Sequence, residues 1–457
     1  MKSPKNPGYC LACGARLSEP IFTLDNMPVG AQAMPSYEEL SGDKGVTLPL
    51  CRCEKCGLVQ FDCEPVDYYR DAIRVVGLSE TMQELRRTDY RYLIDNYALK
   101  GKKWIECGCG NGDFLKVLTE FPVDIYGTEA GEAGIEEARE KLCRDGNIDE
   151  SHIMSFFPEN ADIEIPGGPF DCFLSFNFLE HQPDPKSMLG CLYNNLADGG
   201  IGIITVPSFE YILENGSYYE LIRDHIANYD MDSLERLVIS CGFSVLEKER
   251  IGIGDTLRVV VKKADNNKAS VNADGISKKN DSDTENGYTI GALSETSENV
   301  IDRISKKLPD NGNGDNSENI NKRTEDTNDK YRVLAYNYFM MRRDIAGYME
   351  DLERKGRSIA LWGAGHQGFT IASTTALKDN VRYIIDSSPK KYGRFAPASH
   401  LRIVPPDTYF EHPVDVIMIA APGYIKEIEK TIREMYGVHG KGPGVPAICD
   451  VTDMTER

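Results

Sequence analysis

The chain has 457 residues, which is more than one ordinary domain holds, so we expect two or three domains. Its net charge of −20 argues against nucleic-acid binding, because proteins that hold a phosphate backbone concentrate positive charge. The N-terminal residues contain no apolar core of a signal peptide, and no apolar run approaches the ~20 residues of a membrane span. We therefore predict a cytoplasmic protein with no membrane partner, whose 13 cysteines are thiols or metal ligands.

Residues 1–66 are predicted to form a small zinc domain. They contain two C-x-x-C pairs, each followed by glycine, whose members are Cys10, Cys13, Cys53 and Cys56. Four thiolates close a tetrahedral zinc site without an open position, so the metal would be structural. Cys51 stands two residues from Cys53 in a predicted strand and would point to the opposite face, so we leave it and Cys63 out of the site. The alternative is four buried free cysteines.

Residues 104–129 predict a strand, a tight turn, a helix and a second strand that ends in an acid. The positions that define this unit are Glu106, Gly108, Gly110, Gly112 and Glu129. A dinucleotide-binding turn needs its third glycine where Asp113 stands. The E-x-G-x-G-x-G run instead resembles motif I of the class I S-adenosylmethionine-dependent methyltransferases. A dinucleotide site, or a Rossmann unit that has lost its ligand, is the alternative.

This resemblance implies that the glycine turn accommodates the methionine end of S-adenosylmethionine and that Glu129 binds the ribose hydroxyls. Residues 170–185 and 196–208 are buried strands ending in polar or glycine turns, and they resemble motifs IV and VI of the same superfamily. The cofactor-binding residues implied are Glu106, Gly108, Gly110, Asn111, Gly112, Glu129, Ala130, Asn177, Phe178 and Leu179. We therefore assign residues 67–263 to a central class I methyltransferase domain with a Rossmann-like α/β fold.

The segment 264–330 is rich in Asn, Asp, Ser, Lys and Glu and has one aromatic residue, so we predict a disordered linker or insertion. Residues 331–457 then predict a long helix and a second Rossmann-like α/β domain. Its glycine turn, with Gly363, Gly365 and Gly368, fits G-x-G-x-x-G, and Asp386 ends the next strand. By this pattern alone, NAD would be the expected ligand.

Residues 387–410 change that interpretation. They resemble the D-x-x-P-x-K-x-G-R-x-x-P block in the C-terminal domain of the sugar C-methyltransferases that act on nucleotide-linked 4-keto-deoxysugars. Proteins of that family combine a four-cysteine zinc domain, a class I methyltransferase core and a Rossmann-like C-terminal domain that helps to bind the sugar nucleotide. The same three parts occur here in the same order. The resemblance implies that Lys390 and Arg394 contact the sugar nucleotide, while Ala398, His366 and Gln367 depart from the family pattern.

Methylation of a carbon next to a ketone requires a base that removes a proton and a group that stabilises the enolate. His225 lies in a segment that resembles the family's Tyr-x-Glu-His sequence, with Asp224 in place of the glutamate and Ile222 in place of the tyrosine. We predict His225 as the base, with Asp224 as its neighbour. His181, directly after motif IV, is the second candidate or an enolate stabiliser; its alternative role is packing or capping.

Residues 67–87 resemble the family's helix start that lines the cofactor and sugar pockets. Ser79 and Met82 match that pattern, which implies cofactor contact for Ser79 and substrate contact for Met82. For Ser79, the alternative is a helix N-cap with Glu80 in the first turn.

The sequence thus predicts a C-methyltransferase of a nucleotide-activated deoxysugar that needs S-adenosylmethionine and a structural zinc ion. The rival interpretations are an O- or N-methyltransferase of another activated metabolite, and a non-catalytic nucleotide-binding or scaffold protein. The expected partner is the nucleotide sugar. The nucleotide, the sugar and the oligomeric state are left open, a monomer included.

Overall fold

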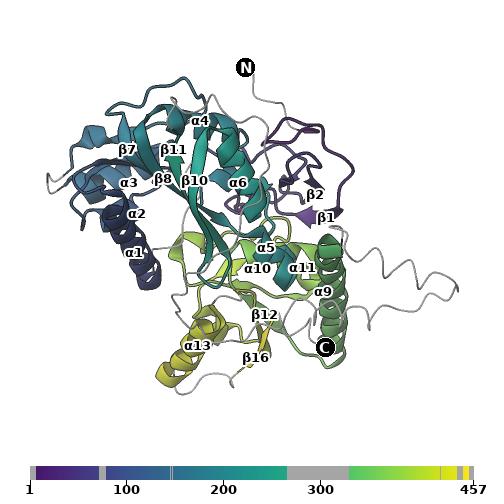
Figure 1. The fold of residues 1–457 in the computed structure, drawn as a ribbon. Coiled ribbons are helices and arrows are strands. Elements are labelled where there is room, and N and C mark those ends of the chain that lie inside the picture. The colour runs from purple at the N-terminus through teal and green to yellow at the C-terminus, as the bar shows by residue number, and fades with distance from the viewer. Residues whose placement is uncertain are drawn as a thin grey trace, which may run out of the picture.

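The computed structural model describes residues 7–70, 79–144, 146, 148–264, 329–421, 424–439 and 446–451. Most of the predicted linker, residues 265–328, lies outside the described residues. In the part described, the chain forms a four-stranded, a seven-stranded and a five-stranded sheet (Figure 1). The predicted α/β class is therefore confirmed. Among the helices that can be described, none is long and apolar enough to cross a membrane.

The N-terminal sheet has the strand order β1-β2-β3-β9 and is antiparallel throughout. Its strands are β1 (Phe22–Met27), β2 (Val46–Arg52), β3 (Val59–Phe61) and β9 (Ala227–Asn228). β9 belongs to the central part of the chain, directly after His225, and pairs with β3 through Gln60 opposite Ala227. Phe61 N also donates to Ile226 O at 3.0 Å. The N-terminal sheet is thus completed by the loop that carries the predicted catalytic histidine.

The central sheet has the order β10-β11-β8-β7-β4-β5-β6. Its strands are β4 (Lys103–Cys107), β5 (Asp124–Glu129), β6 (Ile153–Ser155), β7 (Phe170–Phe176), β8 (Leu196–Pro207), β10 (Phe243–Ile251) and β11 (Thr256–Lys263). β11 is antiparallel to both of its neighbours, and the five strands from β8 to β6 pair in parallel. Their carboxyl ends therefore meet at one edge, where ligands bind in open α/β sheets.

Helices cover both faces of the central sheet, as its nearly continuous apolar strands require. They are α1 (Glu80–Tyr97), α2 (Asp113–Leu118), α3 (Glu132–Cys143), α4 (Pro185–Asn194) and α6 (Met231–Ser240), with short turns η1 (Glu150–His152) and η2 (Leu179–His181). The helix α5 (Phe209–Asn215) and the turn η3 (Tyr218–Glu220) follow β8 and pack in a core shared with the C-terminal domain. Trp104 and Leu174 pack with α2 and α3, whereas the adjacent Ile105 and Phe173 pack with α4 and α6. This alternation is the period of two that a strand imposes.

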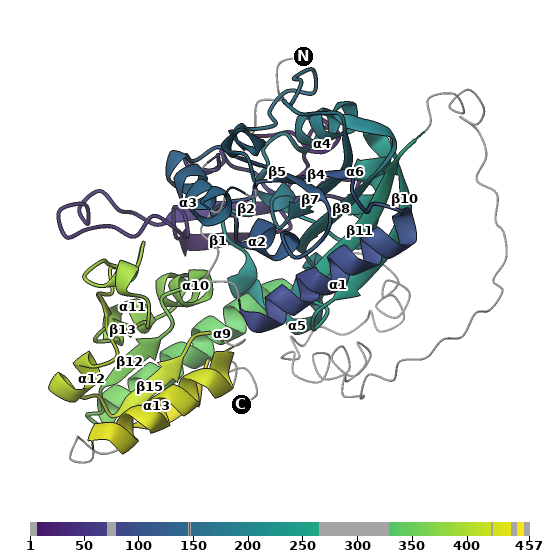
Figure 2. The ribbon, with the colours of Figure 1, turned by 90° about the vertical axis from the view of Figure 1, so that its left-hand side faces the viewer.

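The C-terminal sheet is parallel, with the order β14-β13-β12-β15-β16. Its strands are β12 (Ile359–Trp362), β13 (Ile384–Ile385), β14 (Ile403–Val404), β15 (Val416–Ile419) and β16 (Ala447–Asp450). The helices are α9 (Asp329–Arg354), α10 (His366–Thr374), α11 (Leu377–Asn380), α12 (Thr408–Glu411) and α13 (Ile425–His439), with the turn η5 (Pro389–Lys391). This domain lies below the central sheet in both views (Figure 2).

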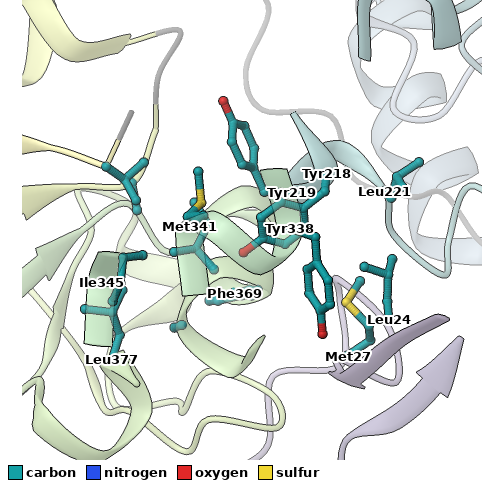
Figure 3. Close-up of a cluster of buried hydrophobic side chains, with 14 of the residues drawn as sticks. Leu24, Met27, Tyr218, Tyr219, Leu221, Tyr338, Met341, Ile345, Phe369 and Leu377 are labelled. Atoms are coloured by element: carbon teal, nitrogen blue, oxygen red, sulfur yellow. The ribbon is translucent and has the colours of Figure 1, made fainter. Parts of the chain in front are cut away.

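One hydrophobic core joins the two ends of the chain. Leu24 and Met27 of β1 pack in the same cluster as Tyr218 of η3, Tyr338 of α9 and Phe369 of α10 (Figure 3). The Tyr338 hydroxyl also accepts a hydrogen bond from Asp25 N at 3.2 Å. The N-terminal sheet and the C-terminal domain are therefore packed against each other and against η3, although they are far apart in the sequence.

Candidate active site

The glycine turn after β4 is built from left-handed backbone. Gly108, Gly110 and Gly112 have φ of 75°, 53° and 76°, where residues with a Cβ are disfavoured. A Cβ on Gly108 would lie 2.4 Å from the ring of Phe178, whereas one on Gly110 would meet nothing within 4 Å. The turn is therefore closed by Phe178 on one side and open above Gly110, which leaves a cradle for a ligand at the carboxyl edge of the sheet.

The acid at the end of β5 reaches back to this turn. Glu129 accepts hydrogen bonds from Gly110 N at 3.0 Å, Ala130 N at 2.8 Å and Gly131 N at 3.0 Å. The carboxylate is thus held beside the open cradle, in the position where a ribose would need an acceptor. The residues present fit the adenosine end of S-adenosylmethionine.

Glu106 lies under the turn and is buried. One of its carboxylate oxygens, Oε2, has no hydrogen-bond partner. Burial raises the pKa of Glu106 to about 8, although the nearby Arg86 guanidinium acts in the opposite direction. Arg86 is itself buried, pairs with Asp89 at 2.9 Å and lies 3.7 Å from the ring centroid of Phe176. An unpartnered acid beneath the turn fits a ligand that brings a hydrogen-bond donor, such as an ammonium group.

The motif IV residues follow β7 along the same edge. Asn177 is exposed, has a φ of 48° and accepts a hydrogen bond from Thr205 Oγ1 at 2.9 Å. Phe178 is half-buried and closes the glycine turn, while Leu179 is fully buried in the core beside α4 and α6. Asn111 lies in the turn, where its carbonyl accepts from Lys141 Nζ at 2.9 Å.

The start of α1 is set by a cap. The Ser79 side chain accepts from Met82 N at 3.2 Å, which is the N-cap interaction that the sequence offered as the alternative. Met82 is 41% exposed. The segment 71–78 before them, which the sequence comparison placed at the substrate pocket, lies outside the described residues.

Two histidines meet beyond the end of β7. The ring centroids of His181 and His225 are 4.8 Å apart in an edge-to-face arrangement. His181 Nδ1 lies 2.8 Å from the Asp224 carbonyl oxygen, and burial lowers the pKa of both imidazoles. Neutral His181 therefore carries its proton on Nδ1, facing the carbonyl, and presents the Nε2 lone pair. The two residues that the sequence singled out from seven histidines do lie together.

Glu180 joins this pair. It is 2% exposed, neither carboxylate oxygen has a hydrogen-bond partner, and Oε1 lies 3.8 Å from His181 Nε2. Burial raises the pKa of Glu180 to about 8. Glu180 was not among the predicted site residues. Its position between Leu179 and His181 is the one feature of the sequence that points to it, because its burial depends on the packing of η2.

The Asp224 side chain has a different partner from the one expected. Its carboxylate accepts from the Tyr68 hydroxyl at 2.6 Å and from Ala31 N at 2.8 Å. Burial and the adjacent Asp224 charge raise the pKa of Tyr68. The carboxylate therefore ties the histidine loop to the N-terminal segment, and it is the backbone carbonyl of Asp224 that orients His181. Tyr68 is a site residue that the sequence analysis missed.

The four predicted zinc ligands form one cluster. Cys10 Sγ lies 3.4 Å from Cys56 Sγ, Cys13 Sγ lies 3.5 Å from Cys53 Sγ, and all four sulfurs are within 4.8 Å of one another. A tetrahedral zinc site with Zn–S bonds of about 2.3 Å separates its sulfurs by about 3.8 Å, so the cluster fits zinc. Cys51 is buried and does not belong to the cluster.

The glycine turn of the C-terminal domain lies next to η3. Glu220 of η3 contacts two residues at the start of α10, with Oε1 2.5 Å from Gln367 Nε2 and Oε2 3.2 Å from His366 Nε2. Asp386 accepts from Ala364 N at 2.9 Å and pairs with Lys391 Nζ at 3.0 Å. Asp386, the acid that suggested an NAD site, is thus already paired with a lysine and hydrogen-bonded to the backbone of the glycine turn.

Two family profiles match the chain. One, described as a methyltransferase domain, matches residues 80–248, and the other, described as a C-methyltransferase C-terminal domain, matches residues 316–442. The chain contains a methyltransferase domain. The match over residues 80–248 supports the predicted methyltransferase class.

Several curated proteins are similar to the methyltransferase domain. A ubiquinone biosynthesis O-methyltransferase of Psychrobacter arcticus is 26% identical over 156 residues, which cover 32% of this chain and 60% of that protein. The enzyme of the same name from Stutzerimonas stutzeri is 29% identical over 120 residues, covering 26% of this chain and 50% of that protein. The chain thus spans about half the length of these relatives.

Solved structures with a similar domain include an S-adenosylmethionine-dependent methyltransferase of Clostridium acetobutylicum. It has 14% identity and a TM-score of 0.32, and the match covers 39% of this chain and 89% of that one. Magnesium protoporphyrin IX methyltransferase of Synechocystis has 16% identity and a TM-score of 0.32, and the match covers 43% of this chain and 90% of that one.

The C-methyltransferase C-terminal domain carries the two predicted substrate residues on its surface. Lys390 is exposed, whereas the neighbouring Lys391 is the one that pairs with Asp386. Arg394 Nη1 lies 3.6 Å from Glu39 of the N-terminal segment. The contact of both residues with a substrate stays a prediction.

Proposed function

We propose that the protein is an S-adenosylmethionine-dependent C-methyltransferase that methylates a carbon next to the ketone of a nucleotide-activated deoxysugar. The observation that carries the proposal is a pair of neutral histidines, His181 buried and His225 half-buried, between the cofactor turn and a C-methyltransferase C-terminal domain, whose glycine turn contacts η3 through Glu220. Neutral imidazoles next to a methyl donor suit a reaction that begins with proton removal from carbon.

The residues of the chain have separate roles in the proposed reaction. The glycine turn and Glu129 hold the cofactor, which supplies the methyl group. His225 accepts the proton from the carbon next to the ketone, and His181, oriented by the Asp224 carbonyl, stabilises the negative charge that develops on the ketone oxygen. The four-cysteine zinc cluster supports the fold around β3 and β9. We place the reaction in the cytoplasm, which suits a chain whose thirteen cysteines, all of them described, form no disulfide.

Deuterium exchange tests this function. The full-length protein would be incubated in D₂O with S-adenosylhomocysteine and a panel of nucleoside diphosphate 4-keto-deoxysugars, and ring protons would be followed by NMR. We expect exchange at one carbon next to the ketone. His225→Asn should lower the exchange rate by roughly 10²- to 10⁴-fold, the contribution of a positioned base, with cofactor binding retained. His181→Asn should be milder. Exchange with none of the sugars would contradict the proposal.

A second candidate is O-methylation, the reaction for which the two similar ubiquinone biosynthesis enzymes are named. O-methylation requires removal of a proton from a hydroxyl group and not from a carbon atom. This candidate therefore predicts methyl transfer without deuteration of the sugar ring. The position of a ¹³C-methyl group delivered from labelled cofactor distinguishes the two products directly.

A further inference from the structure

The side chains of Glu180, His181 and His225 converge at one point beyond η2. Each offers one ligand atom, and these atoms lie within 4.8 Å of one another. Glu180 Oε1 and His181 Nε2 are 3.8 Å apart. Two imidazoles and one carboxylate are a ligand set used by divalent transition metals.

The carboxylate of Glu180 lacks a counter-charge. Both oxygens are buried without a hydrogen-bond partner, and among the described residues the one basic side chain within 4.0 Å is the His181 imidazole. A buried carboxyl group either stays protonated or is paired with a cation or a metal ion. A bound cation would therefore supply the partner that the Glu180 oxygens lack.

His181 is already oriented as a ligand. Its Nδ1–H faces the Asp224 carbonyl at 2.8 Å, which leaves Nε2 with a lone pair on the side of Glu180. Metal-binding histidines characteristically donate their second ring N–H to a carbonyl or carboxylate in this way. The carbonyl is in turn fixed, because the Asp224 side chain is held by Tyr68 and Ala31.

We propose that Glu180, His181 and His225 bind one divalent transition-metal ion at the active site. Bonds of about 2.0–2.2 Å bring ligand atoms to roughly 3 Å from one another, so the trio would close by an ångström or two, within the reach of side-chain rotation. Three protein ligands leave coordination positions open for an oxygen of the substrate. This site is separate from the four-cysteine cluster, whose ligands are all sulfur.

The inference rests on the proposed function for its substrate, the carbonyl oxygen of the keto-sugar, and it changes two roles. In the metal-loaded enzyme His225 would be a ligand instead of the base, and the ion would take the place of His181 as the group that polarises the ketone. The proton from the neighbouring carbon would then pass to a hydroxide ion held at an open coordination position. The Glu180 carboxylate would bind the ion directly, whereas the mechanism with His225 as the base gives Glu180 no role.

Manganese binding tests the site. Mn²⁺ prefers oxygen and nitrogen ligands over thiolates, so the zinc cluster does not compete for it. The full-length protein, treated with a mild chelator, would be titrated with Mn²⁺ and followed by electron paramagnetic resonance. We expect one ion per chain. Glu180→Gln and His225→Asn should each weaken binding by more than about 100-fold, since residues that merely orient a ligand already contribute 10- to 100-fold.

Glu106→Gln is the matched control, because it replaces another buried glutamate of the same domain and should leave Mn²⁺ binding unchanged. Retained S-adenosylhomocysteine binding by Glu180→Gln would show that the variant is folded. Absence of stoichiometric binding, or equal binding by wild type and both ligand variants, would overturn the proposal. The titration contains no sugar, so failure of the exchange assay with every keto-sugar would count against the proposed function alone.

Discussion

The hydrogen bonds of the Asp224 carboxylate should stabilise the protein by an amount that a double-mutant cycle can measure. Tyr68 donates to Oδ1 at 2.6 Å and Ala31 N donates to Oδ2 at 2.8 Å, in a side chain that is almost fully buried. A hydrogen bond to an ionised group contributes roughly 1.5–3 kcal/mol, and one between neutral groups about 0.5–1.5 kcal/mol. Tyr68→Phe should therefore lower the free energy of unfolding by about 1.5–3 kcal/mol.

The cycle separates this bond from the rest of the site. In an Asp224→Asn background the acceptor is neutral, so Tyr68→Phe should cost about 0.5–1.5 kcal/mol, which gives a coupling of about 1–1.5 kcal/mol between the two residues. Urea unfolding can be followed by the fluorescence of Trp104 and Trp362, which are buried in the central and C-terminal sheets. Tyr69→Phe is the control, because the Tyr69 hydroxyl makes no hydrogen bond to any other residue that the structure describes; it should change stability by less than about 0.5 kcal/mol. A coupling near zero, or an equal effect of Tyr69→Phe, would refute the role assigned to Asp224.

Three further outcomes are expected. Glu129→Ala removes the acceptor beside the glycine turn and should weaken S-adenosylhomocysteine binding at least tenfold in calorimetry, whereas unchanged affinity would reject the cofactor site. Cys10→Ser should release the copurified zinc and destabilise the protein, while Cys51→Ser should retain the metal in elemental analysis; zinc loss from the latter would show that the ligand set is wrong. Because burial raises the pKa of Glu106 from 4.5 to about 8, the folded protein binds one more proton than the unfolded chain in that interval. Glu106 therefore contributes stability that is lost as the pH of the ligand-free protein rises from 5.5 to 7.5, and Glu106→Gln should make the change of stability with pH more positive by at most about 1.4 kcal/mol per pH unit in urea titrations; an unchanged slope would contradict the burial argument.

The features that the sequence predicted well are local. The unit from β4 to β5 is one strand, one turn, one helix and one strand in succession, so the spacing of its glycines and of Glu129 was enough to place them together. The four-cysteine cluster followed from the chemistry of two C-x-x-C pairs, and its zinc ion stays a prediction. For Ser79 the sequence allowed two roles, and the structure shows the cap.

The features that were missed depend on contacts between distant segments. The pairing of β3 with β9 and the bond from Tyr68 to Asp224 join segments separated by more than 150 residues, and no local pattern encodes either one. The lack of hydrogen-bond partners for the Glu180 carboxylate also depends on distant contacts, because it results from the side chains that pack around η2. The partner of Asp386 was also missed, at the scale of one residue. Lys390 and Lys391 are adjacent in η5, and the structure shows that Lys391 is the one that pairs with Asp386.

The common core of β1 and α9 has a consequence for biosynthesis. Asp25 and its partner Tyr338 are 313 residues apart, so the N-terminal sheet leaves the ribosome long before the helix that covers it. Until then Leu24 and Met27 lack their packing partners, and contacts of such long sequence separation form slowly and expose apolar surface to aggregation. A version of the protein that ends before α9 would retain this uncovered face permanently, so the methyltransferase domain should be difficult to produce alone unless β1 is made polar or α9 is supplied as a separate chain.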